Sequence, residues 1–156
     1  MNKHNVYVCV GAPGSGKSTW SKQFVADNPT VVRLCPDEFR AQFGTGEGDQ
    51  TVSAKAFAAT REGMDAALAS GKDVLIDATN MHHKGRKEIL AIAKKYNANK
   101  IAVVFEATRQ TLIERNQRRG AEGGRAVPDD VIDRMLSNYQ VPTHSDFDEI
   151  QFISRV

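Results

Sequence analysis

The stretch Gly11-Ala12-Pro13-Gly14-Ser15-Gly16-Lys17-Ser18-Thr19 decides the fold of this 156-residue chain. It fits the pattern G-x-x-x-x-G-K-S/T, the phosphate-binding P-loop. A β-rich apolar run at 6–10 comes before it, and residues 19–26 follow with apolar side chains at helical spacing. A strand, a glycine-rich loop and a helix in this order are the setting that the motif requires. The stretch therefore predicts a nucleotide site rather than a chance glycine-rich turn.

The residue types of the loop indicate how phosphates would be held. Glycines let backbone N–H groups turn inward, and the N-terminus of the following helix adds free N–H groups and partial positive charge. We expect Lys17 to reach the β- and γ-phosphates of ATP or another nucleoside triphosphate, and the Ser18 hydroxyl to bind Mg²⁺. The residues expected to contact the nucleotide here are Gly14, Ser15, Gly16, Lys17, Ser18 and Thr19.

Segments typical of strands and helices alternate along the chain. Apolar runs predict strands at 6–10, 31–35, 73–77, 101–105 and 150–153. Helical spacing predicts helices at 19–26, from Asp37 as the N-cap, at 53–70, 84–96 and 108–118, and after Pro128. This alternation favours a mostly parallel sheet with helices on both faces, and hence one α/β domain over residues 1–156.

Composition places the chain among ordinary globular proteins. No run of about 18 apolar residues occurs and no signal peptide is expected, so we expect no membrane span and a cytoplasmic location. The two cysteines, Cys9 and Cys35, fall in apolar strands and are expected to be buried free thiols. Net charge is +2, but residues 84–125 hold 11 Lys+Arg against 4 Asp+Glu. This basic region suits a polyanionic partner or is simply a solvated face.

Asp37 and Arg40 lie three residues apart where a helix is expected to begin, after the second predicted strand. This spacing allows both side chains to face one side. Asp37 could accept the proton of an acceptor hydroxyl, and Arg40 could bind an anionic group of the acceptor. The alternative is a helix-capping Asp beside a surface Arg.

Polar residues also end the third predicted strand, at Asp77, Thr79 and Asn80. The carboxyl ends of strands line the ligand crevice of an open α/β sheet. Asp77 could bind Mg²⁺ directly or through water, while Thr79 and Asn80 could contact the acceptor. The alternative is an Asx-type turn that closes the strand.

Four arginines, Arg115, Arg118, Arg119 and Arg125, surround a glycine-rich run. We interpret residues 118–127 as a flexible lid between two helices. On closing, such a lid would expel water and bring a guanidinium to the transferring phosphoryl group.

These motifs together resemble the 5′-kinase domain of phage polynucleotide kinase/phosphatase. The resemblance covers nearly the whole chain and is carried by the P-loop, by 36–40 (Pro-Asp-Glu-Phe-Arg), 77–80 (Asp-Ala-Thr-Asn), 115–120 and 126–128. It implies a P-loop NTPase fold with strand order 2-3-1-4-5. The implied activity is ATP- and Mg²⁺-dependent phosphorylation of the 5′-hydroxyl of DNA or RNA.

The resemblance also implies roles for single residues. Lys17 and Ser18 would bind phosphates and Mg²⁺, and Asp37 would be the general base. Arg40 would bind the phosphate next to the terminal nucleoside, with Asp77 and Thr79 near that phosphate. Arg119 would act on the donor phosphates, with Arg115 in support.

The sequence departs from that family in three places. The Asp-x-Asp-Gly-Thr phosphatase motif is absent, so we expect no 3′-phosphatase activity. Asp77-Ala78-Thr79 has one residue more than the family's Asp-Thr, and the lid has extra residues, so that Arg118, Arg119 and Arg125 compete for one role. A small-molecule P-loop kinase and a non-catalytic NTP-binding module remain as alternatives.

Overall fold

A five-stranded, all-parallel sheet forms the centre of the molecule. The computed structural model describes residues 3–124 and 126–154. The strands pair side by side in the order β2-β3-β1-β4-β5, which confirms the implied order and the α/β class. They are β1 Asn5–Val10, β2 Val31–Leu34, β3 Asp73–Ile76, β4 Asn99–Glu106 and β5 Glu149–Ser154.

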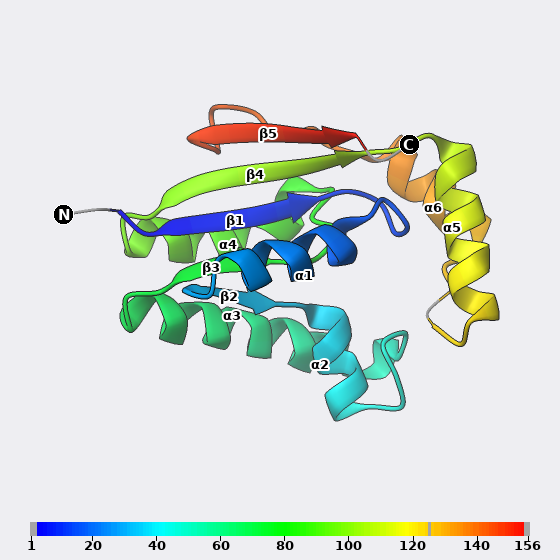
Figure 1. Cartoon of the computed structure of the whole chain (residues 1–156), viewed down its shortest axis with the longest axis horizontal. Helices are drawn as coiled ribbons and strands as arrows, with labels where there is room; N and C mark the ends of the chain where they lie inside the picture. Colours follow the sequence, from blue (N-terminus) through cyan, green and yellow to red (C-terminus); the bar gives the residue numbers. More distant parts are fainter. Residues whose placement is uncertain (1–2, 125, 155–156) are drawn as a thin grey trace.

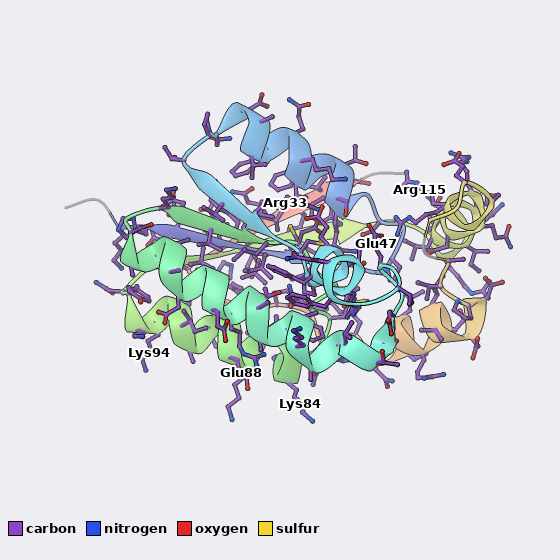
Figure 2. The ribbon with its side chains drawn as sticks, turned by 90° about the horizontal axis from the view of Figure 1, so that it is seen from below. Arg33, Glu47, Lys84, Glu88, Lys94 and Arg115 are labelled. Atoms are coloured by element: carbon purple, nitrogen blue, oxygen red, sulfur yellow. The ribbon has the colours of Figure 1, made fainter. Side chains whose placement is uncertain are left out.

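Helices cover both faces of the sheet, as predicted. Figure 2 shows α1 on one side and α3 and α4 on the other. Figure 1 shows α5 and α6 beyond the carboxyl ends of the central strands, with α2 at the same end of β2. The helices are α1 Lys17–Asp27, α2 Pro36–Phe43, the 3₁₀ turn η1 Gln50–Val52, α3 Ser53–Ala69, α4 His83–Lys95, α5 Arg109–Ala121 and α6 Asp129–Ser137.

The alternation of side chains along β1 divides the core between the two faces. Val6, Val8 and Val10 pack toward α3 and α4, whereas Cys9 packs with Trp20 and Phe24 of α1. A third apolar cluster joins α5 and α6 at the carboxyl end of the sheet, around Leu112, Val127 and Ile132. This third cluster anchors α5 beside the P-loop.

Two expectations about helix ends are wrong. The N-cap of α2 is Cys35, and Asp37 lies inside the first turn, because Pro36 fits the first helical position, where no backbone N–H is needed. Helix α5 continues to Ala121, so Arg118 and Arg119 lie in its last turn and not in a loop. Within 3–124 and 126–154, no helix is long and apolar enough to cross a membrane.

Both thiols are buried and free, as expected. Burial raises the pKa of Cys9, and it raises the pKa of Cys35 from 9.0 to about 11, with the charge of Asp77 as the next cause. Cys35 nevertheless lines the main cleft of the molecule, where it borders α2.

Candidate active site

The P-loop connects β1 to α1 and takes a conformation that depends on glycine. Gly14 and Gly16 have φ values of 87° and 97°, in the left-handed region that favours glycine. The first bond into α1 runs from Trp20 N to the Gly16 carbonyl at 3.1 Å. The N–H groups of Lys17, Ser18 and Thr19 therefore precede that bond, and no acidic residue lies in the first turn. These are the features of an anion site at a helix N-terminus.

Lys17 lies inside the site with its charge held close to the loop. Its ammonium donates to the Ala12 carbonyl at 2.9 Å, and the residue is 8% exposed. Burial lowers the pKa of Lys17, while the charge of Asp77 opposes that shift and the charge of Arg119 adds to it. A bound phosphate would supply the anionic partner that such a desolvated ammonium requires.

Helix α5 braces the P-loop through two side chains. Asn116 donates from Nδ2 to the Pro13 carbonyl at 2.7 Å, and Arg115 donates to the Gly14 carbonyl at 3.1 Å. Arg115 points from α5 toward the loop in Figure 2. A Cβ at Gly14 would come within 2.7 Å of Asn116 Nδ2, so this position must be glycine. Asn116 was not predicted; its position four residues after the buried Leu112 was the available signal.

Asp77 follows β3 directly and forms the centre of a buried polar network. Its Oδ2 accepts hydrogen bonds from Ser18 at 3.0 Å, Ser21 at 2.9 Å and Arg33 at 2.5 Å. Arg33 Nε also donates to Ser21 Oγ at 2.8 Å, and its NH1 donates to Glu38 at 2.7 Å. The carboxylate is thereby fixed against the side chain expected to hold the metal.

Arg33 was missed because a lone arginine in a predicted strand gives no motif signal. In the structure it points from β2 into the network beneath α1 (Figure 2). Burial alone would lower the pKa of Arg33, but the hydrogen bond to Glu38 and the charge of Asp77 raise it above the usual value. Arg33 therefore stays charged and balances Asp77.

The oxygen atoms at this point fit Mg²⁺. Among the described residues, no group of three or more His, Cys, Asp or Glu side chains could enclose a metal. Mg²⁺ in nucleotide sites is bound by one or two protein oxygens together with phosphates and water, and does not need such a cage. The Ser18 hydroxyl, fixed by Asp77, supplies one protein oxygen of that kind.

Asp37 and Arg40 lie on α2 and face the same cleft, which opens beside the P-loop. Arg40 NH1 donates to Asp37 Oδ1. Arg40 Nε donates to Ser53 Oγ at 3.1 Å, and its guanidinium lies 5.4 Å from the centroid of the Phe57 ring. Arg40 is thus no free surface arginine: it is 6% exposed and held on three sides at the edge of the cleft.

The segment after Asp77 is joined to β1 and the P-loop by two hydrogen bonds to backbone carbonyls. Gly11 N donates to the Thr79 carbonyl at 2.9 Å, and Asn80 Nδ2 donates to the Cys9 carbonyl at 3.0 Å. Asn80 has a φ of 47° and its carbonyl accepts from the buried Arg86 at 2.8 Å. Part of the role of Asn80 is therefore structural, and Arg86 was a second position that sequence reasoning missed.

One cleft of about 330 Å³ brings the predicted groups together. It is lined by Gly14, Gly16, Lys17, Ser18, Asp37, Arg40, Asp77, Thr79, Asn80 and Arg119, among others. An adjoining hollow of about 240 Å³ is lined by Gly14, Gly16, Thr19, Arg115 and Arg119. Arg119 thus borders both spaces, whereas Arg118 lies exposed on α5 and Arg125 lies outside the described residues.

Much of the basic region at 84–125 lies away from the cleft. Lys84 and Lys94 point outward from α4 in Figure 2, and Lys95 pairs with Asp65 at 3.2 Å. These lysines fit the solvated-face interpretation. His82 is exposed at the cleft and His83 begins α4, where its ring contacts Arg86.

Comparisons with known proteins give matches that cover most of the chain. The AAA_33 family, described as an AAA domain, matches residues 6–142. An L-seryl-tRNA(Sec) kinase of Methanococcus maripaludis is 27% identical over 141 residues, covering 86% of this chain and 52% of that protein. A chain in the Pnkp1/Rnl/Hen1 RNA repair complex is 27% identical with a TM-score of 0.78, covering 88% of this chain and 44% of that one.

A third match extends over nearly the whole chain. A protein from Chloroflexus aurantiacus gives a TM-score of 0.79 at 19% identity, covering 99% of this chain and 86% of that one, and this likeness concerns the fold. The chain spans about half the length of the other two proteins, 52% and 44%.

Proposed function

We propose that this chain, which belongs to the AAA_33 family of AAA domains, is a kinase of polynucleotide 5′-hydroxyl ends. The proposed reaction uses ATP and depends on Mg²⁺. One observation carries the proposal: Lys17 and Ser18 of the P-loop share a single cleft with Asp37 and Arg40 of α2. A nucleotide-binding module without transfer activity would need the first pair only. The second pair supplies an acceptor base and an anion-binding group.

The chain's own residues define the transfer. Lys17 and the N-terminus of α1 hold the β- and γ-phosphates of ATP, and Arg119 reaches the transferring group from α5. Asp37 takes the proton of the acceptor 5′-hydroxyl while the hydroxyl oxygen forms a bond to the γ-phosphorus. The bond from the γ-phosphorus to the bridging oxygen breaks, and ADP leaves. Mg²⁺ on Ser18, when bound, would neutralise charge on the phosphate oxygens.

Arg40 is the residue that favours a nucleic-acid end as the acceptor. Its guanidinium is preorganised by Asp37 and Ser53 at the cleft surface, and a guanidinium binds phosphate oxygens in a directed way. A polynucleotide places a phosphate one residue from its 5′-hydroxyl, so both groups could bind at once. The relation to a chain of an RNA repair complex supports this choice.

An acceptor panel tests the proposal. Purified protein with labelled ATP and Mg²⁺ should label the 5′ end of 5′-hydroxyl RNA or DNA, and an otherwise identical 5′-phosphorylated oligonucleotide should stay unlabelled. Raising the salt concentration should weaken the binding of the oligonucleotide far more than the binding of a neutral acceptor. Seryl-tRNA, sugars and nucleosides form the other arms. If one of these acceptors is labelled and no oligonucleotide 5′ end is, the polynucleotide assignment is overturned.

A further inference from the structure

The lining of the cleft includes an aromatic ring, Phe57, that phosphoryl transfer itself does not require. Three large hydrophobic side chains are exposed within 3–124 and 126–154: Phe57, Val141 and Phe152. Only Phe57 among these three lines the cleft, and it is 42% exposed. An exposed phenyl ring inside a ligand cleft offers a flat apolar surface to whatever binds beside it.

The ring of Phe57 is placed next to the anion-binding group. Arg40 lies over it at 5.4 Å from the centroid, and the same guanidinium is tied to Asp37. Base, anion site and aromatic ring therefore adjoin one another on α2 and α3. A 5′ end presents three matching groups close together, because its hydroxyl, its first phosphate and its nucleobase are all attached to one sugar.

We propose that Phe57 is the platform on which the nucleobase nearest the accepting 5′-hydroxyl stacks. The inference rests on the proposed function and specifies its substrate: an acceptor with a π face beside the hydroxyl, which sugars and polyols lack. Stacking tolerates every base, because each has a π face. The platform thus predicts an enzyme that requires a terminal base but does not read which base it is.

A small recess beside Phe57 limits where the base can lie. It measures about 30 Å³, shares Pro36, Phe57, Ala78, Asn80 and Gly85 with the cleft, and runs between α3 and α4. That volume holds about one or two water molecules and cannot take a ring. A base stacked on Phe57 would therefore lie outside the recess, on the cleft side of the phenyl ring. Gly85 has open space where a Cβ would project, so a larger side chain there would obstruct the mouth of the recess.

The test is a cycle of two acceptors and a set of variants. The acceptors are a 5′-hydroxyl oligonucleotide and the same oligonucleotide with an abasic tetrahydrofuran unit at its 5′ end. In the wild type the abasic acceptor should have a KM about tenfold higher, the size expected for one stacked base. In Phe57→Ala the two KM values should converge, whereas Phe57→Trp should keep the difference.

Two further variants complete the design. Gly85→Leu should raise the KM of the base-bearing acceptor more than that of the abasic one. Phe152→Ala removes a phenyl ring that is 61% exposed on β5, away from the cleft, and should keep the tenfold difference. Thermal unfolding of each variant confirms that the fold is retained.

The outcomes separate this inference from the function on which it rests. If Phe57→Ala raises both KM values by the same factor, Phe57 only positions Arg40 and the platform is overturned, while the 5′-kinase proposal stands. If the wild type labels neither oligonucleotide, the function itself fails. Adenosine, which offers a base without a phosphate, should be a poor acceptor because Arg40 has no anion to bind; equal use of adenosine would assign the site to free nucleosides.

Discussion

Two aspartates lie at the carboxyl end of the sheet in very different surroundings. The side chain of Asp77, after β3, is 2% exposed and accepts three hydrogen bonds on one oxygen, whereas that of Asp37, in α2, is 32% exposed and faces the cleft. One oxygen of Asp77 is thus occupied by Ser18, Ser21 and Arg33, which suits a carboxylate that holds its neighbours in position. The difference teaches that burial and fixed partners separate a positioning carboxylate from a candidate base, although both line the cleft.

Replacement of the accessible aspartate should have the largest effect. Asp37→Asn keeps an oxygen for Arg40 but removes the proton acceptor, so we expect kcat to fall about a thousandfold, within the range of general-base contributions. Affinity for ATP, measured by calorimetry without acceptor, should change less than about threefold. The neighbouring Glu38→Gln is the matched control, since Glu38 is exposed and its carboxylate bonds to Arg33 instead. A kcat close to that of the wild type in Asp37→Asn would break the comparison.

The arginines of α5 extend the same contrast between cleft and surface. Arg119 borders both hollows of the site, whereas Arg118, one residue earlier, is exposed. Arg119→Gln should lower kcat at least a hundredfold, because it removes one charged donor from the transferring group. Arg118→Gln should retain most activity, and single-turnover kinetics can compare the two. The reverse ranking would contradict the placement of Arg119, and not Arg118, at the transferring group.

Asp77→Asn should act on stability more than on proton transfer. It leaves the Arg33 guanidinium, whose side chain is 10% exposed, without its buried anion, and removing one partner of such a pair costs about 3 kcal/mol. For a domain of this size the midpoint of thermal unfolding should fall by roughly 6–12 °C. Asp37→Asn should lower it by clearly less, because Asp37 is partly solvated. Equal losses in the two variants would contradict the distinction.

These two carboxylates also show how far sequence reasoning reached. The P-loop pattern and the alternation of apolar runs predicted the parallel sheet, because strands that are buried on both faces have continuous apolar sequences. Strand ends predicted that Asp37 and Asp77 would lie at one edge. No motif marked Arg33, and only helical spacing from Leu112 marked Asn116, since their roles arise from partners 44 and 103 residues away.

In the predicted lid at 118–127, a clear sequence signal led to a wrong expectation about local structure. Glycines at 120, 123 and 124 predicted a loop from residue 118, but only Gly123 has the positive φ that favours glycine, and α5 continues through Gly120. Tertiary packing of Leu112 and Asn116 against the P-loop outweighs the low helix propensity of one glycine. Phe57 falls within the helix predicted at 53–70, but helical spacing alone does not show which side of that helix borders a cleft.

The smallest predicted effect uses Cys35 as a reporter of the two charges. Its pKa is raised to about 11, first by burial and next by Asp77, while the charge of Asp37 adds less. The thiolate is the form that alkylates, so at pH 8 the native thiol should react on the order of a hundred times more slowly than in the unfolded chain, where its pKa is near 9. Asp77→Asn removes the anion with the larger effect on this thiol, lowers its pKa and should speed alkylation severalfold in the native protein. Asp37→Asn should speed alkylation less.

Peptide mass spectrometry separates Cys35 from the fully buried Cys9, and hydrogen exchange distinguishes a changed pKa from a loosened fold. Equal rates in the two variants, at equal exchange protection, would mean that Asp77 does not carry the negative charge on which its positioning role depends.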